Sequence, residues 1–179
     1  QPYFDGFRDL ATNGIDKSVL NVFRMLGQMI GTTGGERLSV ESTGALKLEA
    51  IRDQSVRIKP DVNALASRQN RSVTVLVWNY HDDDLPAPAS EVEVVIDGLP
   101  KGQPLLQHYR IDAEHSNSYE VWKKMGSPQQ PTPEQYKKLE QAGQLQLLGA
   151  PQRQQSVNGK LSVKFSLPRQ SVSLLRLMW

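Results

Sequence analysis

Few residues of this chain stand at spacings that support catalysis or metal binding. The three histidines, His81, His108 and His115, have no second ligand-type residue at the spacing of a metal site. The His-Asp-Asp-Asp run at 81–84 suggests a cation loop, but it lacks the alternating ligands and the distant closing glutamate of a calcium loop. A solvated loop explains this run better, and we expect neither a metal nor a cofactor.

Nucleophilic and hydrolytic chemistry has no better support. The chain has no cysteine to act as a thiol nucleophile, and no Gly-x-Ser-x-Gly motif. Sugar hydrolysis requires two carboxyl groups, one as acid and one as nucleophile or base. The 19 acidic residues form no pair that stands out. From the residues alone we predict no catalytic group in the chain.

Composition argues against two classes of partner. The 179 residues include 21 basic and 19 acidic ones, for a net charge of +2, and no basic stripe is visible, so we expect no nucleic acid. No apolar run approaches the roughly 18 residues of a membrane span, so we expect no membrane either. No signal-peptide pattern is seen. Lack of cysteine leaves the compartment open, and the cytoplasm or periplasm of a bacterium both fit.

The elements that would position any site begin with an amphipathic helix. Apolar residues recur three and four apart between Asp16, the expected N-cap, and Gly31, the expected stop. A helix with so wide an apolar face needs a surface to lie on. Its predicted stripe is Val19, Leu20, Phe23, Leu26, Met29 and Ile30, flanked by Val22 and Met25.

From residue 36 onward the sequence predicts short strands. Some eight or nine strands with turns at regular intervals favour an antiparallel β-sandwich, so the fold class is mainly β. A hairpin turn is expected at 157–159. These strands are expected within eleven strand-like segments, 36–42, 45–51, 55–60, 62–69, 71–81, 91–99, 104–112, 145–151, 152–157, 159–168 and 170–179.

A polar, helix-like insert at 112–143 interrupts the strands. Asn117 or Ser118 is expected to cap its first helix, which runs to about Met125 and is ended by Gly126. The second has a complete start signal, with Thr132 as cap, a proline at the first helical position and a glutamine completing a capping box, and it ends at Gly143. Helices this short need tertiary contacts to persist.

Several of these segments resemble the C-terminal region of glycoside hydrolase family 39, which includes β-xylosidases and α-L-iduronidases. The resemblance rests on the run YRIDAEHSNSYEVWKKMGSPQQPT in the insert, LVWNYHDDD upstream and SLPRQSVSLLRL near the end. The run GIDKSVLNVFRMLGQM also resembles the last helix of the family's (β/α)8 barrel, which precedes its β-sandwich. The resemblance implies two domains, with 1–35 as the last loop and helix of the barrel and 36–179 as an accessory sandwich.

The resemblance also implies what the chain lacks. Family members are retaining glycosidases with two glutamates on the barrel, one of them in an Asn-Glu-Pro motif, and neither that motif nor a Glu-Trp pair occurs here. A barrel takes about 250 residues, which this chain cannot hold beside a sandwich. Both glutamates should therefore lie upstream. The expected partners are the barrel of the same enzyme and short xylose-containing saccharides, and this chain alone should not hydrolyse glycosides.

Seven residues are candidates for the rim of the sugar pocket. The opening run QPYFDGF resembles a stretch that borders this pocket, so Tyr3 and Phe4 are predicted as an apolar wall for a pentose and Asp5 as an acceptor for sugar hydroxyls. The insert contributes candidates on a surface loop, where function concentrates. These are His115, Asn117, Tyr119 and Trp122. The competing interpretation is that all seven merely pack the barrel rim or the insert.

Two other functions stay open. A free-standing carbohydrate-binding module would present a row of exposed aromatic side chains, but the chain is only 7% aromatic. An oligomerisation domain would use the insert to reach a neighbouring subunit, giving a homo-oligomer. Titration with xylo-oligosaccharides tests the first alternative, and sizing at several concentrations tests the second.

Overall fold

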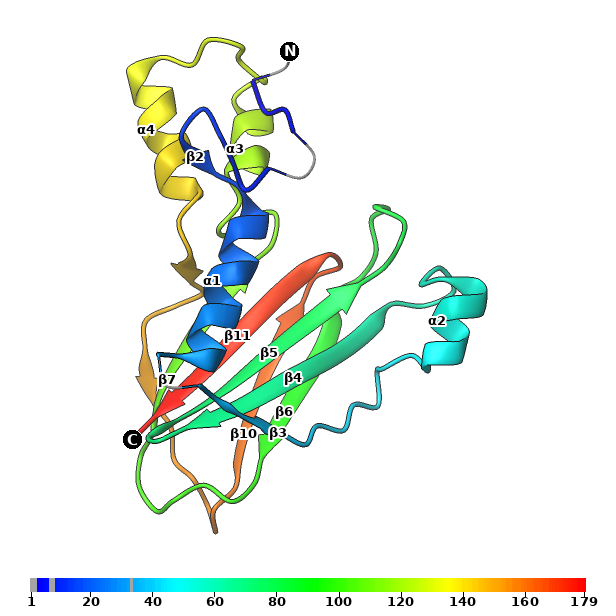
Figure 1. Ribbon diagram of the computed structural model, residues 1–179, viewed down its shortest axis with the longest axis vertical. Coiled ribbons are helices and arrows are strands. Elements are labelled where there is room, and N and C mark those ends of the chain that lie inside the picture. The colour runs from blue at the N-terminus through cyan, green and yellow to red at the C-terminus, as the bar shows by residue number, and fades with distance from the viewer. Residues whose placement is uncertain (1–2, 7–8, 33) are drawn as a thin grey trace.

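The computed structural model describes residues 3–6, 9–32 and 34–179. A long antiparallel sheet and a two-stranded ribbon form one end of the molecule, and a small helical lobe forms the other (Figure 1). Helix α1 (Ser18–Ile30) runs from the lobe onto the sheet. The prediction of a mainly β, antiparallel fold with a two-helix insert is confirmed.

The larger sheet has seven antiparallel strands in the order β3-β4-β5-β11-β7-β8, with β9 also paired to β7. Its centre is the long pair of β5 and β11, in which Leu76 faces Leu174. These strands are rich in β-branched and leucine side chains, which suit a sheet covered on both faces. Their bounds are β3 (Glu36–Leu38), β4 (Asp61–Gln69), β5 (Ser72–Tyr80), β7 (Leu105–Ile111), β8 (Gln146–Leu147), β9 (Gln152–Arg153) and β11 (Ser171–Met178).

A ribbon of β6 (Ser90–Ile96) and β10 (Leu161–Leu167) covers one face of this sheet. Because side chains alternate along a strand, the odd-numbered valines of β5 point towards the ribbon. They form the main core with Leu175 and Leu177 of β11 and with Leu161 and Leu167 of β10. The sandwich is therefore unequal, with seven strands on one side and two on the other.

Helix α1 covers part of the opposite face. Its Met25 and Met29 pack on Leu76, Ile111 and Leu174, and this second core is smaller than the first. The molecule thus has three layers at this point, namely helix, sheet and ribbon. Among the described residues, no helix combines the length and the apolar character that a membrane crossing requires.

The helical lobe brings the start of the chain against the insert. It contains the two-residue strands β1 (Ala11–Thr12) and β2 (Ile15–Asp16) with the helices α3 (Ser118–Lys124) and α4 (Pro133–Ala142). Both predicted caps of the insert are present. Asn117 accepts a hydrogen bond from the backbone of α3, and Thr132 forms the capping box of α4.

The apolar stripe of α1 is not buried as predicted. The buried line is Asn21, Met25 and Met29, whereas Val19, Phe23 and Ile30 are 40%, 56% and 57% exposed. Asn21 sets this rotation, because its amide donates to the carbonyl oxygens of Ser116 (3.2 Å) and Gly143 (2.8 Å) of the insert. The apolar stripe is therefore divided between a packed face and an open face.

The N-cap of α1 also differs from the prediction. The cap residue is Lys17 and not Asp16. The carboxylate of Asp16 instead accepts a hydrogen bond from Arg24 at 2.7 Å, so it is not free to cap the helix. Gly31 ends the helix as predicted, with φ of 61°.

Several predicted strands are absent or shortened. Residues 45–51 were expected to be extended, but α2 (Leu48–Gln54) forms there, because Leu, Glu, Ala and Arg favour a helix over this short range. Residues 55–60 form no strand, because Val56 pairs with the loop at Asp82. Residues 145–157 keep only β8 and β9, since Pro151 between them has no N–H to donate.

Candidate functional site

Four of the seven candidate residues form one aromatic cluster in the helical lobe. The ring of Phe4 lies at its centre, 5.9 Å from Tyr3, 5.7 Å from Tyr119 and 5.2 Å from Trp122. Tyr119 and Trp122 are 5.7 Å apart on the same side of α3. These separations are those of favourable aromatic pairs. The fold thus joins two segments that are more than one hundred residues apart in sequence.

Hydrogen bonds hold the opening segment against the insert. The backbone N–H of Tyr3 donates to the side-chain oxygen of Gln129 at 2.8 Å. The hydroxyl of Tyr136 on α4 donates to the carbonyl of Asn13 at 3.2 Å. The hydroxyl of Ser118 donates to the carbonyl of Asp16 at 2.6 Å. The opening segment has little regular structure of its own, so these bonds fix where its aromatic rings lie.

Tyr119 and Trp122 contribute to the surface in different degrees. Trp122 is only 6% exposed, and its indole N–H donates to the carbonyl of Pro128 at 2.9 Å. Tyr119 is 43% exposed, and the ammonium of Lys123 lies 5.0 Å from its ring centroid. An exposed ring of this kind can stack on the apolar face of a sugar, whereas Trp122 supports it from below.

Asp5 lies beside the cluster in a polar recess. One of its oxygens accepts a hydrogen bond from the N–H of Gly6 at 2.7 Å, and the ammonium of Lys17 binds the carbonyl of Gly6 at 2.6 Å. Carboxylate and amide groups in such a recess can bind the hydroxyls of a sugar. The lining residues are Tyr3, Asp5, Gly6, Asp9, Ala11, Thr12, Asn13 and Gln129.

His115 and Asn117 are held in the turn that leads into α3. The carboxylate of Asp112 accepts hydrogen bonds from the ring of His115 at 2.9 Å and from its backbone N–H at 2.8 Å. Asn117 donates to the carbonyl of Asp112 at 3.1 Å and caps α3. Both side chains stabilise this turn, and neither is part of the aromatic cluster.

Sequence analysis missed a buried polar network inside the sandwich. Arg110 is 2% exposed, and its guanidinium donates to Ser173 (2.8 Å) and to the carbonyl of Ser166 (3.0 Å), and pairs with Asp112 (3.3 Å). His108 shares the hydroxyl of Ser173 at 2.9 Å. The sequence did contain a sign of this network. His108 and Arg110 are two residues apart on β7, and this spacing places both side chains on the face that carries Leu106.

Burial shifts the ionisation of this network. Burial, together with the charges of Arg110 and His115, lowers the pKa of His108 to about 4. Burial also lowers the pKa of Arg110, against the effect of Asp112. Burial alone would raise the pKa of Asp112, but hydrogen bonds from His115 and Glu114 hold it below its ordinary value. The neutral imidazole is thus the form that fits the fold.

The described residues contain no group of three or more His, Cys, Asp or Glu side chains placed to hold a metal ion. The chain therefore combines an unequal β-sandwich with a helical lobe whose surface has an aromatic cluster and a polar recess. These features define the class as a mainly β domain with a helical extension.

The family follows from comparison with known proteins. Residues 1–160 match the model of the family described as Glycosyl hydrolases family 39, and the chain belongs to this family. No curated protein sequence matches the chain.

Solved structures share the fold. A family 39 β-xylosidase from Caulobacter crescentus is 16% identical over 99% of this chain and 31% of its own, with a TM-score of 0.69. The bacterial orthologue of human α-L-iduronidase is 22% identical over 92% of this chain and 27% of its own, with a TM-score of 0.67. A family 39 enzyme from Xanthomonas axonopodis pv. citri is 21% identical over 64% of this chain and 25% of its own, with a TM-score of 0.58. This chain thus spans less than a third of each relative.

Proposed function

We propose that this chain is the C-terminal accessory region of a retaining, β-xylosidase-like glycoside hydrolase. In this proposal the catalytic glutamates lie upstream on a (β/α)8 barrel, and residues 1–35 are the last loop and helix of that barrel. Residues 36–179 then form the sandwich beside it. The substrates would be xylosides and short xylo-oligosaccharides, as the name of the Caulobacter relative suggests.

The open face of α1 is the observation that carries this proposal. Val19, Phe23 and Ile30 are large apolar side chains that the sheet does not cover. Exposed apolar surface of this kind marks a contact with another part of a protein. A barrel that continues from α1 would cover it, because the other face of the same helix already packs on the sandwich.

The helical lobe would then shape the entrance to the barrel's sugar pocket. The exposed ring of Tyr119 and the recess at Asp5 offer a stacking surface and hydroxyl-binding groups next to each other in the lobe. Tyr3 and Phe4 would form the apolar wall between them. Among the described residues, no comparable row of exposed aromatic rings lies on the sandwich, so a free-standing sugar-binding module has less support than a pocket rim.

Reconstitution of the enzyme from two pieces tests the proposal. The 179-residue chain and the polypeptide that carries the barrel would be expressed separately, mixed, and assayed on a β-xyloside. We expect no hydrolysis by the chain alone and activity from the mixture. Phe23→Glu should weaken assembly at least tenfold, because it places a charge in the apolar contact.

Leu48→Glu is the matched control, because Leu48 is 79% exposed on α2, well away from α1. It should leave assembly unchanged. Hydrolysis by the chain alone, or equal effects of the two variants, would contradict the proposal. Binding of xylo-oligosaccharides by the chain alone, without assembly, would favour the sugar-binding module instead.

A further inference from the structure

A fully buried amide joins helix α1 to the insert. Asn21 lies in the first half of α1 and is 0% exposed. Its amide nitrogen donates to the carbonyl oxygens of Ser116 (3.2 Å) and Gly143 (2.8 Å), which lie just before α3 and just after α4. One side chain thus ties both ends of the insert to a single position on α1, at the base of the lobe (Figure 1).

A third partner fixes the orientation of this amide. Arg24, one turn further along α1, donates to the side-chain oxygen of Asn21 at 2.9 Å and to the carboxylate of Asp16 at 2.7 Å. The oxygen of the amide is therefore occupied, and its nitrogen has to face the insert. Leucine has a similar size but no donor, so at this position it would deprive two backbone carbonyl oxygens of a buried hydrogen bond.

The insert also lies very close to the residues that lead into α1. The hydroxyl of Ser118 donates to the carbonyl oxygen of Asp16 at 2.6 Å. A Cβ atom at position 143 would lie 2.6 Å from the same carbonyl oxygen, so only glycine permits this approach. Ser116 and Ser118 are both fully buried. The junction between α1 and the insert is therefore closely packed as well as hydrogen-bonded.

This junction determines where the exposed ring of Tyr119 lies. Tyr119 follows Ser118 directly in the first turn of α3, and α3 has only seven residues. A helix this short depends on tertiary contacts for its position. The core of the lobe is small, and the hydrogen bonds that involve Asn21 and Asp16 tie the start of α3 to the α1 side of the junction. Loss of the Asn21 contact would let the ring of Tyr119 move.

We propose that Asn21 is a positioning residue, which holds Tyr119 where its ring stacks on a sugar unit beyond the bond that is cleaved. In this role Asn21 favours xylo-oligosaccharides over simple xylosides, because only the longer substrates present a second sugar to the ring. Stacking requires two faces in close contact, so a small displacement of the ring weakens it. This inference rests on the proposed function, in which the lobe shapes the entrance to the sugar pocket.

Kinetics of the complete enzyme on two substrates test this role. Xylotriose has further sugar units that can reach the rim, whereas methyl β-xyloside has a single sugar. Asn21→Leu should raise KM for xylotriose about fivefold, which is the effect expected from the loss of one stacked ring. KM for methyl β-xyloside should change much less. The value of kcat should stay close to that of the original enzyme, because the reacting groups lie on the barrel.

Gln69→Leu is the matched control at the other end of α1. The amide of Gln69 also donates to two backbone carbonyl oxygens of α1, those of Gln28 (2.9 Å) and Met29 (3.0 Å). Gln69 belongs to β4, so these bonds tie α1 to the sheet. Its loss should lower the melting temperature without changing the ratio of the two KM values. Equal KM changes in both variants would mean that Asn21 only stabilises α1.

A double-mutant cycle shows whether Asn21 acts through Tyr119. Tyr119→Ala alone should raise KM for xylotriose about as much as Asn21→Leu, and the double variant should be no worse than Tyr119→Ala. Additive effects on KM would contradict the proposal. If thermal melting shows that Asn21→Leu does not fold, Gly143→Ala takes its place. Its added methyl group displaces the insert from Asp16 and should give the same pattern of KM values.

Tyr119→Ala also separates this inference from the proposed function. A higher KM for xylotriose with Tyr119→Ala, but not with Asn21→Leu, would keep Tyr119 at the pocket rim and refute the role of Asn21. An unchanged KM with Tyr119→Ala in an active enzyme would refute the pocket rim itself, and the role of Asn21 with it.

Discussion

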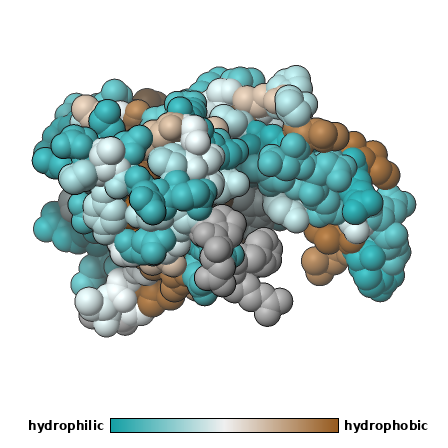
Figure 2. All heavy atoms as spheres, turned by 90° about the horizontal axis from the view of Figure 1, so that it is seen from above, coloured by the Kyte–Doolittle hydropathy of each residue, from teal (hydrophilic) through white to brown (hydrophobic). Residues whose placement is uncertain are grey.

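The sandwich and the helical lobe are held together in different ways. The main core of the sandwich contains eleven buried apolar residues, and long strand ladders surround it. The core of the lobe has three, Ile15, Trp122 and Leu139, and the surrounding partly buried side chains are mostly aromatic. Figure 2, which looks down on the lobe, shows a mostly hydrophilic surface with separate hydrophobic patches.

The difference shows how a weakly built region can still carry a defined surface. Hydrogen bonds between side chains of the insert and backbone groups of the opening segment hold the lobe together at sequence separations above 100. The opening segment and the insert therefore stabilise each other, and neither is expected to stay ordered alone. Regions with small cores open locally at lower free energy than the rest of a protein. Such a region suits a pocket entrance, which has to admit and release a ligand.

The largest test of this contrast uses two leucines that are both fully buried. Leu175→Ala in the sandwich should lower the free energy of unfolding by about 4 kcal/mol and lower the unfolding midpoint of the whole chain. Leu139→Ala in the lobe should lower the free energy of local opening of the lobe by about 3 kcal/mol, because the lobe opens before the sandwich. Denaturant unfolding and amide exchange would be measured for both. Equal exchange across the whole chain in Leu139→Ala would mean that lobe and sandwich unfold as one unit.

A smaller effect concerns the pH dependence of the sandwich. The unfolded chain protonates His108 near pH 6.5, whereas the folded chain does so near pH 4, so the unfolded state binds more protons between these values. Stability is therefore complete above pH 6.5 and falls by about 2 kcal/mol as the pH drops to 4, with allowance for partial exposure of the ring. Urea unfolding at several pH values measures this loss.

His108→Gln is the control for this effect, because glutamine can still reach Ser173 but does not titrate in this range. It should remove the slope between pH 6.5 and 4, while exchange in the lobe stays unchanged. A slope that persists in the variant would assign the pH dependence to other groups.

The smallest test concerns the cap of α4. Thr132→Ala removes the hydroxyl that accepts from the backbone of Gln135, and should cost about 1 kcal/mol. The loss should appear as faster exchange in α4 and in the opening segment, which Tyr136 ties to this helix. Thr132→Ser keeps the hydroxyl and should restore protection. Faster exchange in the sandwich instead of the lobe would remove the distinction between the two regions.

Local signals predicted the insert better than the first half of the sandwich. The caps at Asn117 and Thr132 depend on neighbours three residues away, so the sequence specifies them directly. The alternation at 45–51 was ambiguous, because Leu48 and Ile51 are also spaced for a helix. The aromatic candidates of the site were identified by residue type, but nothing in the sequence placed Phe4 beside Tyr119 and Trp122.

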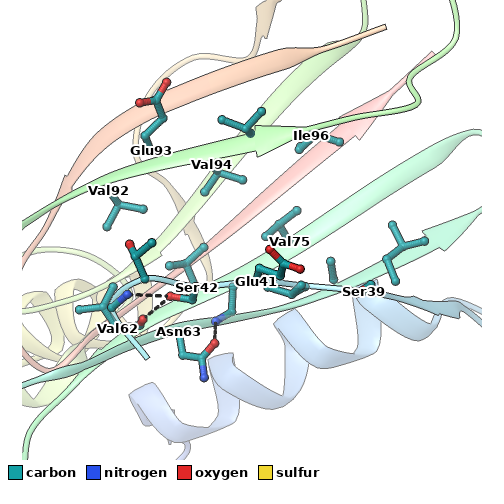
Figure 3. Close-up of a pocket in the computed structure, with 18 of the residues that line it drawn as sticks. Ser39, Glu41, Ser42, Val62, Asn63, Val75, Val92, Glu93, Val94 and Ile96 are labelled. Atoms are coloured by element: carbon teal, nitrogen blue, oxygen red, sulfur yellow. Dashed lines mark hydrogen bonds between the residues drawn. The ribbon is translucent and has the colours of Figure 1, made fainter. Parts of the chain in front are cut away.

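The mainly β class, the two capped helices of the insert and the family resemblance could all be predicted from the sequence, because each depends on short-range pattern. Which face of α1 is open depends on the folded chain, since a distant contact through Asn21 turns the helix on the sheet. The same holds, among the described residues, for the free edge of β6 above an apolar groove (Figure 3), because strand order follows from pairings far apart along the chain. Non-local contacts of this kind leave no local signature in the sequence. They leave the apolar face of α1 exposed and, in the described part of the chain, one edge of β6 unpaired.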